Sequence, residues 1–129
     1  MKIEELFSVK DKVAVVTGGS RGIGEMIASA YLANGATVYI TSRKADVCDA
    51  KAIELSEKYN AQCTSLPSDL SSLAGIEKFV RELEALESGI DILVNNAGAA
   101  CAEPIDVFSE KGWDKVMDLN VKSVFFSTQ

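Results

Sequence analysis

Histidine is absent from the 129 residues, and cysteine and proline are scarce. Without histidine, the chain cannot hold a Ser-His-Asp or Cys-His catalytic set of its own. Its three cysteines, Cys48, Cys63 and Cys101, are odd in number, lie far apart and form no C-x-x-C pair. This spacing disfavours a disulfide framework or a zinc site and indicates free thiols in a reducing cytoplasm. We therefore expect no metal site.

Positive charge is also in short supply, because 13 Lys and Arg face 19 Asp and Glu, for a net charge of −6. An acidic chain disfavours nucleic acid and anionic membrane surfaces as partners. No apolar run is long enough to span a membrane, and the acidic start at residues 1–5 is unlike a signal peptide. With 47% hydrophobic and 25% charged residues, the composition is that of a globular protein. We expect one cytoplasmic domain over residues 1–129.

A glycine-rich stretch, Thr17–Gly24, organises the chain. A short β-branched run precedes it at residues 12–16, and a stripe at helical spacing follows with Ile23, Ile27, Ala30 and Tyr31. Glycines at such a strand-to-helix turn let the backbone bend sharply and let a ligand come close. The free N–H groups at the start of the helix then favour a phosphate. A turn that serves only helix–sheet packing is the alternative. The pattern predicts cofactor contacts for Gly18, Gly19, Ser20, Arg21, Gly22, Ile23 and Gly24.

Apolar runs and helical stripes alternate along the rest of the chain. The expected strands span residues 12–17, 36–41, 62–66 and 90–95, and the expected helices span residues 22–34, 45–59, 73–86 and 109–129. The last helix carries a stripe that we expect to be buried: Trp113, Val116, Met117, Asn120, Val121 and Val124. Strands that alternate with helices imply parallel βαβ units. The predicted fold class is α/β, with the first four strands of a doubly wound parallel sheet of the Rossmann type.

The residues after the second strand indicate which dinucleotide would bind. In such folds an acidic residue at this place holds the ribose 2′-OH, whereas an Arg accepts a 2′-phosphate. Here Ser42, Arg43 and Lys44 occupy the place, no Asp or Glu precedes Asp46, and Arg21 adds a cation within the glycine loop. A solvated helix start is the alternative for Arg43 and Lys44. Because two arginines pair well with a phosphate dianion, we expect NADP(H), with contacts from Ser42 and Arg43.

Three further positions are ambiguous when the residues are considered alone. Asp69 follows the third strand and can either accept from an adenine amino group or cap the next helix. Asn95–Gly98 follows the fourth strand, at the edge of the sheet where open α/β folds bind ligands. Asn120 interrupts an apolar stripe, and an amide there is commonly bonded to backbone.

These stretches together resemble the short-chain dehydrogenase/reductase family over the whole chain, and they are most similar to its ketoacyl-reductase-like members. The resemblance implies an NADP(H)-dependent oxidoreductase that reduces a small-molecule carbonyl by hydride transfer, with a 3-oxoacyl thioester as one candidate substrate, in a homo-oligomer. It implies cofactor contacts for Asp69, Leu70, Asn95, Asn96, Ala97 and Gly98. It also implies a catalytic role for Asn120, as the Asn of an Asn-Ser-Tyr-Lys set that kinks its helix and holds a proton-relaying water.

The Ser, Tyr and Lys of that set have no counterparts in these 129 residues. The family's Tyr and Lys stand four residues apart, whereas Tyr31, Tyr39 and Tyr59 are followed four residues on by Gly, Arg and Cys. The sequence also reaches Gln129 within a helical pattern, with no stop signal. We therefore expect the N-terminal half of a longer reductase, inactive by itself. The alternatives are a non-catalytic nucleotide-binding module and an interaction fragment that completes its sheet with another chain.

Overall fold

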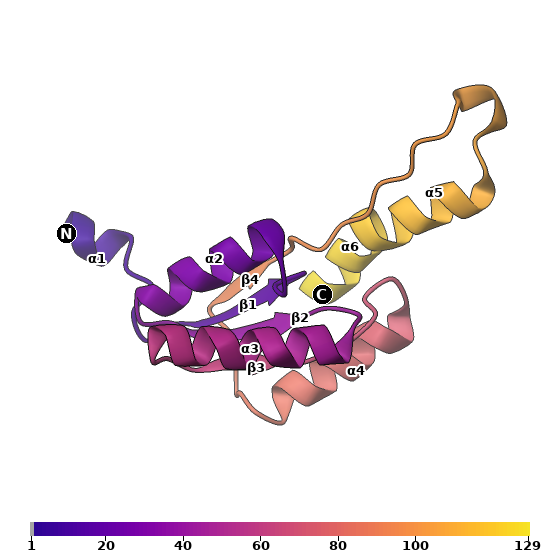
Figure 1. Cartoon of the computed structure of the whole chain (residues 1–129). Helices are drawn as coiled ribbons and strands as arrows, with labels where there is room; N and C mark the ends of the chain where they lie inside the picture. The colour runs from indigo at the N-terminus through magenta and orange to yellow at the C-terminus, as the bar shows by residue number, and fades with distance from the viewer. Residues whose placement is uncertain (1) are drawn as a thin grey trace.

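The computed structural model describes residues 2–129, and a parallel sheet forms its centre (Figure 1). The strands are β1 (Val13–Thr17), β2 (Thr37–Thr41), β3 (Cys63–Ser65) and β4 (Ile92–Val94), in the order β3-β2-β1-β4. All neighbouring strands run parallel. The chain steps outward from β1 to β3 and then returns to the other side of β1, so the order reverses between β1 and β4. This confirms the predicted doubly wound parallel sheet.

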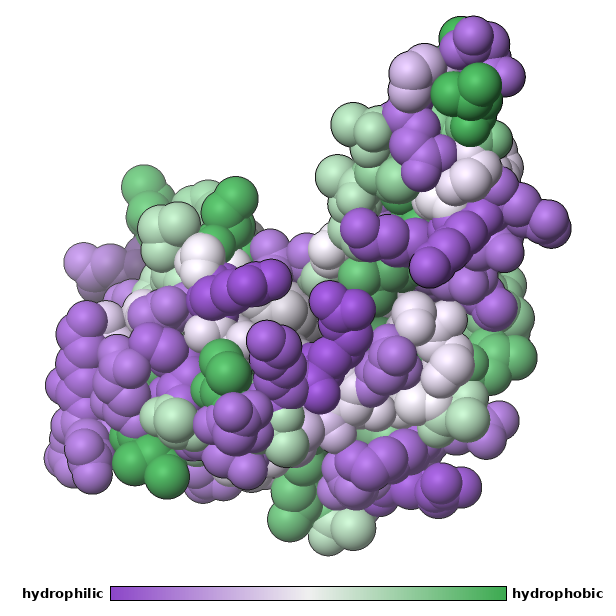
Figure 2. Space-filling model, turned by 45° about the vertical axis from the view of Figure 1, so that its right-hand side comes forward, coloured by the Kyte–Doolittle hydropathy of each residue, from purple (hydrophilic) through white to green (hydrophobic). Residues whose placement is uncertain are grey.

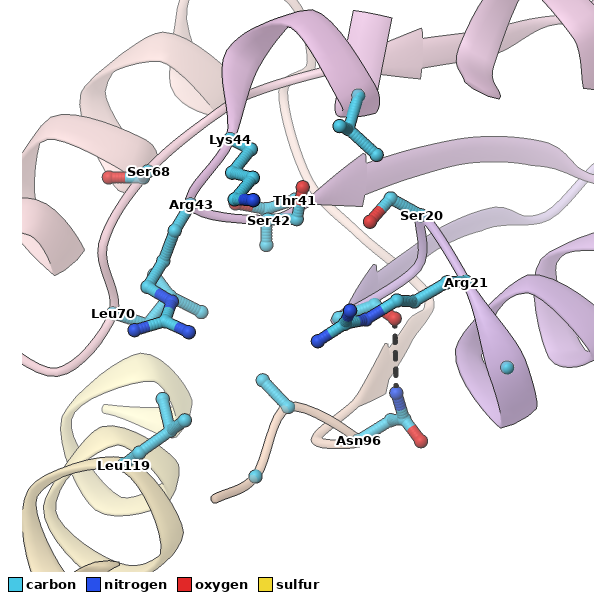
Figure 3. A pocket seen from close by; sticks show the side chains of 15 residues that line it. Ser20, Arg21, Thr41, Ser42, Arg43, Lys44, Ser68, Leu70, Asn96 and Leu119 are labelled. Atoms are coloured by element: carbon cyan, nitrogen blue, oxygen red, sulfur yellow. Dashed lines mark hydrogen bonds between the residues drawn. The ribbon is translucent and has the colours of Figure 1, made fainter. Parts of the chain in front are cut away.

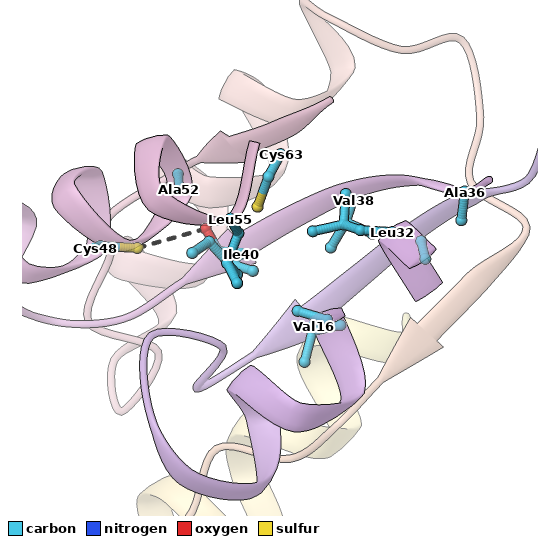
Figure 4. Close-up of a cluster of buried hydrophobic side chains, with 11 residues drawn as sticks. Val16, Leu32, Ala36, Val38, Ile40, Cys48, Ala52, Leu55 and Cys63 are labelled. Carbon is cyan, nitrogen blue, oxygen red and sulfur yellow. Dashed lines mark hydrogen bonds between the residues drawn. The ribbon is translucent and has the colours of Figure 1, made fainter. Parts of the chain in front are cut away.

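Helices cover both faces of the sheet, which explains why the middle residues of β1 and β2 are apolar on both faces. One face packs against α2 (Gly22–Ala33) and α3 (Ala45–Tyr59), and the other against α4 (Leu73–Glu84) and α6 (Ser123–Thr128). Successive residues of each strand point to opposite faces. The core beneath α2 and α3 is drawn in Figure 4 and contains Val16, Leu32, Val38, Ile40, Cys48, Ala52 and Leu55. The core on the opposite face contains Val15, Tyr39, Leu66, Leu70, Ile76, Phe79 and Leu83.

The observed elements are shorter than the expected ones by one or two residues at several ends. The strand expected at residues 90–95 pairs only over Ile92–Val94, because Asp91 turns its carboxylate back to accept from the N–H of Val13 (2.8 Å) and from Lys12 Nζ (3.3 Å). These two bonds hold the pKa of Asp91 below its usual value. A short helix, α1 (Ile3–Leu6), precedes the sheet. No helix within residues 2–129 is long and apolar enough to cross a membrane.

Helix α2 buries Gly24, Ala28 and Leu32. Of the stripe noted in the sequence, Ile27 and Tyr31 pack against this core from its margin, whereas Ile23 is 66% exposed. The small residues Gly24 and Ala28 let the helix lie close to the structure beneath it, so the larger side chains flank the buried line instead of forming it.

The last helix is interrupted, and its predicted buried stripe is wrong. It consists of α5 (Glu110–Met117), a π-helical turn η2 (Asp118–Lys122) and α6. Trp113, Asn120 and Val121 are exposed, whereas Val116, Met117 and Val124 are only half-buried. Helix α5 extends past the edge of the sheet (Figure 1), so within residues 2–129 it packs against the preceding loop and not against the sheet.

Residues 99–117 form an arm that projects from the sheet (Figures 1 and 2). Its loop includes a 3-10 turn, η1 (Ile105–Val107), and runs back beside α5. Lys115 Nζ donates to the carbonyl of Ala100 (3.1 Å). The Glu103 carboxylate accepts from the N–H and the hydroxyl of Ser109 (2.6 and 3.1 Å), which lowers its pKa. The arm is thus internally bonded although Ile105 at its tip is 92% exposed.

The two outer strands of the sheet end differently. Ser56 of α3 reaches over β3, where its hydroxyl donates to the carbonyl of Cys63 (3.1 Å) and accepts from its N–H (3.0 Å). These are the groups that Cys63 turns away from β2, so Ser56 closes the outer edge of β3 at Cys63, whereas no bond covers the outward groups of Ser65 within residues 2–129. In β4 the outward groups are those of Leu93, and no side chain of residues 2–129 takes them in the same way.

Candidate functional site

The glycine loop brings free backbone N–H groups to the carboxyl end of the sheet. Gly18 and Gly22 have positive φ angles of 68° and 59°, a conformation that glycine adopts without strain. The N–H groups of Gly18 and Gly19 donate to the carbonyl of Thr41 (2.8 and 3.3 Å), which fixes the loop against β2. Helix α2 then begins at Gly22, and its N-cap residue Arg21 makes no side-chain capping bond. The first N–H groups of α2 are therefore available to a ligand.

Two of the glycines serve packing instead. A Cβ atom on Gly19 would lie 2.6 Å from Cγ2 of Ile40, and one on Gly24 would overlap the carbonyl oxygen of Gly18. By contrast, a Cβ atom on Gly22 would meet nothing within 4 Å, so that side of the loop is open.

Thr17 connects the glycine loop to the turn after β4. Its hydroxyl donates to the carbonyl of Val94 (3.3 Å) and accepts from the N–H groups of Asn96 (3.0 Å) and Ala97 (2.9 Å). In turn, the side-chain amide of Asn96 donates to the carbonyls of Thr17 (2.9 Å) and Gly18 (3.3 Å). These bonds hold the Asn95–Gly98 turn against the glycine loop, as neighbouring walls of one site.

A cavity of about 460 Å³ lies between these walls (Figure 3). It opens at the carboxyl ends of β1, β2 and β4, where the order of strands reverses. This is where open α/β sheets bind ligands. Most of the residues predicted to contact a cofactor line it: Gly18, Ser20, Arg21, Gly22, Ser42, Arg43, Leu70, Asn96, Ala97 and Gly98. Gly19, Ile23, Gly24, Asp69 and Asn95 do not line it.

The cavity is positively charged although the chain is acidic. Arg21, Arg43 and Lys44 line it, no Asp or Glu does, and none of the three cations forms a salt bridge within residues 2–129. Figure 3 shows the two guanidinium groups extending into the cavity from different walls, Arg21 from the glycine loop and Arg43 from the end of β2. Unpaired cations that share a cavity repel one another, and an anion relieves this repulsion.

Other lining residues were not predicted as cofactor contacts, although Lys44 was noted beside Ser42 and Arg43: Thr41, Lys44, Val47, Ser68 and Leu119. Lys44 and Thr41 flank the predicted Ser42 and Arg43, so extending that motif by one residue on each side would have found them. The buried hydroxyls of Thr41 and Ser42 have no hydrogen-bond partner. Leu119 carried no signal, because only the π-turn brings it to the cavity.

Two predicted contacts are engaged elsewhere. One carboxylate oxygen of Asp69 accepts from the hydroxyl and the N–H of Ser71 (2.7 and 3.0 Å), so its side chain forms a local turn. The bond with the Ser71 hydroxyl is the main cause of its lowered pKa, to which nearby Arg43 also contributes. The amide of Asn95 donates to the hydroxyl of Thr128 (3.2 Å), which ties the end of β4 to α6.

Asn120 lies within the π-turn, beside the Asn95–Gly98 turn. Its side chain accepts from the N–H of Ala99 (2.8 Å) and donates to the carbonyl of Ala99 (2.9 Å). Both polar atoms of its amide are therefore bonded to the main chain, which was the alternative considered for Asn120 from the residues alone. A π-turn inside an α-helix is a frequent mark of a functional position.

A parallel doubly wound sheet with a glycine turn and a cavity at its switch point defines a nucleotide-binding α/β protein. Within this class, a family model described as short chain dehydrogenase matches residues 12–129, and the chain belongs to this family.

Named relatives agree with this assignment. The rhamnolipids biosynthesis 3-oxoacyl-(acyl-carrier-protein) reductase of Pseudomonas aeruginosa is 46% identical over 123 residues, which cover 95% of this chain and 47% of that protein. An NAD-dependent glycerol dehydrogenase of Listeria innocua is 38% identical, with the same coverage. The solved Pseudomonas aeruginosa RhlG/NADP active-site complex is similar with a TM-score of 0.89 and 46% identity, again over 95% of this chain and 47% of that one. The chain thus spans about half the length of the curated relatives it matches.

Proposed function

We propose that this chain is the NADP(H)-binding half of an oxidoreductase that reduces a carbonyl group by hydride transfer. The observation that carries the proposal is the cavity with three unpaired cations and no carboxylate, beside the uncapped start of α2. A ribose 2′-phosphate brings two negative charges to such a place, whereas a free 2′-OH calls for an acidic partner. The NADP complex of a 46% identical relative supports the choice, although the similar glycerol dehydrogenase is described as NAD-dependent.

The residues of the cavity fit this cofactor. The free N–H groups at Gly22 and the open side of the loop suit the pyrophosphate, and Arg21, Ser42 and Arg43 suit the 2′-phosphate. Leu70 offers an apolar contact to the adenine ring. The second carboxylate oxygen of Asp69 accepts no hydrogen bond within residues 2–129, so it can accept from the adenine amino group. When bound, the nicotinamide ring supplies the hydride.

The remaining predicted residues have supporting roles in this proposal. Ala97 and Gly98 form the wall beside the cofactor, while Asn95 holds the end of β4 in place. Gly19 and Gly24 allow the close packing of the loop, and Ile23 contributes its N–H near the start of α2.

Asn120 is proposed to act through its place in the helix. Because its amide is already bonded to Ala99, its side chain positions the turn that carries Gly98 and Ala99. Any water that it holds for a proton relay would then bind to the main chain of the π-turn.

The substrate is proposed from the relatives. A 3-oxoacyl thioester is supported by the 46% identical reductase. We further propose that the parent enzyme is a cytoplasmic homo-oligomer with one cofactor-binding domain over residues 1–129, which fits the two buried free thiols, Cys48 and Cys63.

Cofactor titration of Arg43→Ala tests the proposal. The loss of one charge-assisted hydrogen bond should weaken NADPH by about 1.5–3 kcal/mol and leave NADH nearly unchanged. Arg81→Ala on α4 is the matched control, because it removes the same group far from the cavity and should change neither affinity. Equal losses for the two cofactors, or no binding of NADPH by the wild type, would refute the proposed function.

A further inference from the structure

The four longest helices within residues 2–129, α2 to α5, begin in two different ways. Helices α4 and α5 start from serines, Ser72 and Ser109, whose hydroxyls accept from the N–H groups of Gly75 and Gly112 (3.1 and 3.0 Å). Helices α2 and α3 start from cations, Arg21 and Lys44, and neither makes a side-chain capping bond. Both cationic caps line the same cavity, and neither serine does.

A cation is a poor start for a helix. Serine, threonine, aspartate and asparagine satisfy a free N–H group at this position, which a lysine cannot do. A positive charge is also repelled by the positive end of the helix dipole. Lys44 has extended backbone angles, φ −92° and ψ 108°, of the kind found at ordinary N-caps. A serine would therefore fit at this position without a change of backbone, so the backbone does not demand lysine.

Two hydroxyl groups beside Lys44 also lack hydrogen-bond partners within residues 2–129. Thr41 lines the cavity and is 0% exposed, and its hydroxyl has no partner. The hydroxyl of Ser42 is also unpaired. In Figure 3, Lys44, Thr41 and Ser42 lie together where β2 ends and α3 begins. An ammonium group can only donate and a hydroxyl can donate as well as accept, so a negatively charged acceptor of hydrogen bonds would satisfy all three groups at once.

We infer that Lys44, assisted by the hydroxyl of Thr41, is a specificity-determining residue for a phosphomonoester dianion. The inference rests on the proposed function, in which that group is the 2′-phosphate of NADP(H). Lys44 lowers the stability of the free protein at the start of α3, and this destabilisation is relieved when the phosphate binds. The preference for a phosphorylated ribose is therefore shared between Arg43 and Lys44, and it is coupled to stability at Lys44.

The test compares Lys44→Ser with Lys44→Arg in this chain, by calorimetric titration with NADPH and NADH and by thermal unfolding without nucleotide. Lys44→Ser should weaken NADPH about tenfold, change NADH by less than about twofold, and raise the unfolding midpoint by about 4 °C. Lys44→Arg keeps the cation, so it should retain most of the NADPH affinity and show no rise in midpoint. Lys58→Ser, at the other end of α3, is the matched control and should leave both affinities unchanged and not raise the midpoint.

The outcomes separate the inference about Lys44 from the proposed preference for NADP(H). A Lys44→Ser protein that keeps the NADPH to NADH ratio of the wild type overturns the inference, even when the wild type prefers NADPH as proposed. An unfolding midpoint that does not rise overturns it as well, because the coupling to stability is then absent. A wild type that binds NADH and NADPH equally refutes the proposed cofactor itself, which is a different result.

Discussion

The register partners Thr17 and Thr41 offer a matched test of how the site is held together. They end neighbouring strands, and both side chains are buried. The hydroxyl of Thr17 makes three hydrogen bonds, to Val94, Asn96 and Ala97, whereas the hydroxyl of Thr41 makes none within residues 2–129. Replacing each by valine removes the same hydroxyl and keeps the shape of the side chain. Only the number of bonds lost differs between the two variants.

The expected costs follow from that number. Thr17→Val leaves the N–H of Ala97 without a partner, whereas the N–H of Asn96 keeps the carbonyl of Val94 (3.0 Å). An unsatisfied buried donor costs about 1–3 kcal/mol, and a net hydrogen bond is worth about 1 kcal/mol. Because Ala97 is only half-buried, we expect a loss of about 1–3 kcal/mol in the free energy of unfolding. Thr41→Val removes an unpaired buried hydroxyl, so its stability should change by less than about 0.5 kcal/mol or rise.

Urea unfolding followed by far-ultraviolet circular dichroism measures both changes. The fluorescence of Trp113 would not serve, because this residue is 58% exposed on the arm and does not report on the sheet. Each variant should be measured at several protein concentrations, so that association is not mistaken for stability. Similar losses for the two variants would refute the reasoning, since they would mean that the bonds of Thr17 contribute nothing beyond its shape.

Three further outcomes are expected. The 129-residue chain alone should oxidise no NADPH with simple ketones or acyl-thioester analogues, because it carries no Tyr-xxx-Lys pair; turnover above a blank in protein free of host reductases would contradict this. The open edge of β4 and the exposed Trp113 and Val121 should make the chain associate, which light scattering would detect. A monodisperse monomer whose amides at residues 90–95 are strongly protected from hydrogen exchange would contradict this. Burial, together with a 2.6 Å hydrogen bond to Glu87, raises the pKa of Tyr39 from 10.0 to about 12. The stability that the protonated Tyr39 contributes should therefore be complete below pH 10 and be lost as the pH rises to 12. Tyr39→Phe should remove this pH dependence from the urea midpoints.

The sequence predicted the sheet well, because both faces of its central strands are covered. The runs at Val13–Thr17 and Thr37–Thr41 are apolar apart from their terminal threonines and do not alternate, which fits a parallel strand covered on both faces. The helix expected at residues 73–86 was also found, as α4, with Ile76, Phe79 and Leu83 facing the core. Failures arose where burial depends on a distant neighbour. The stripe that includes Trp113 is amphipathic, yet Trp113 and Val121 are more than half exposed.

The candidate site was predicted only in part, again because some contacts depend on residues that are distant in the sequence. Glycines and arginines carry a local signal, so Gly18, Gly22 and Arg43 were found. Whether a side chain points into a cavity or forms a local turn depends on neighbours in space. Asp69 prefers Ser71, which is two residues away, and the sequence could not rank that contact against the adenine.

The unequal edges of the sheet limit how copies of this chain can combine. At the β3 edge Ser56 already occupies the outward groups of Cys63, whereas no side chain of residues 2–129 bonds to those of Leu93 at the β4 edge. A unit with two open edges can add others indefinitely and grow into a fibre, whereas a unit with one can only pair. Two copies that join through β4 cover the more open edge of each. Further growth would have to begin at β3, where Ser56 competes with an incoming strand for the groups of Cys63.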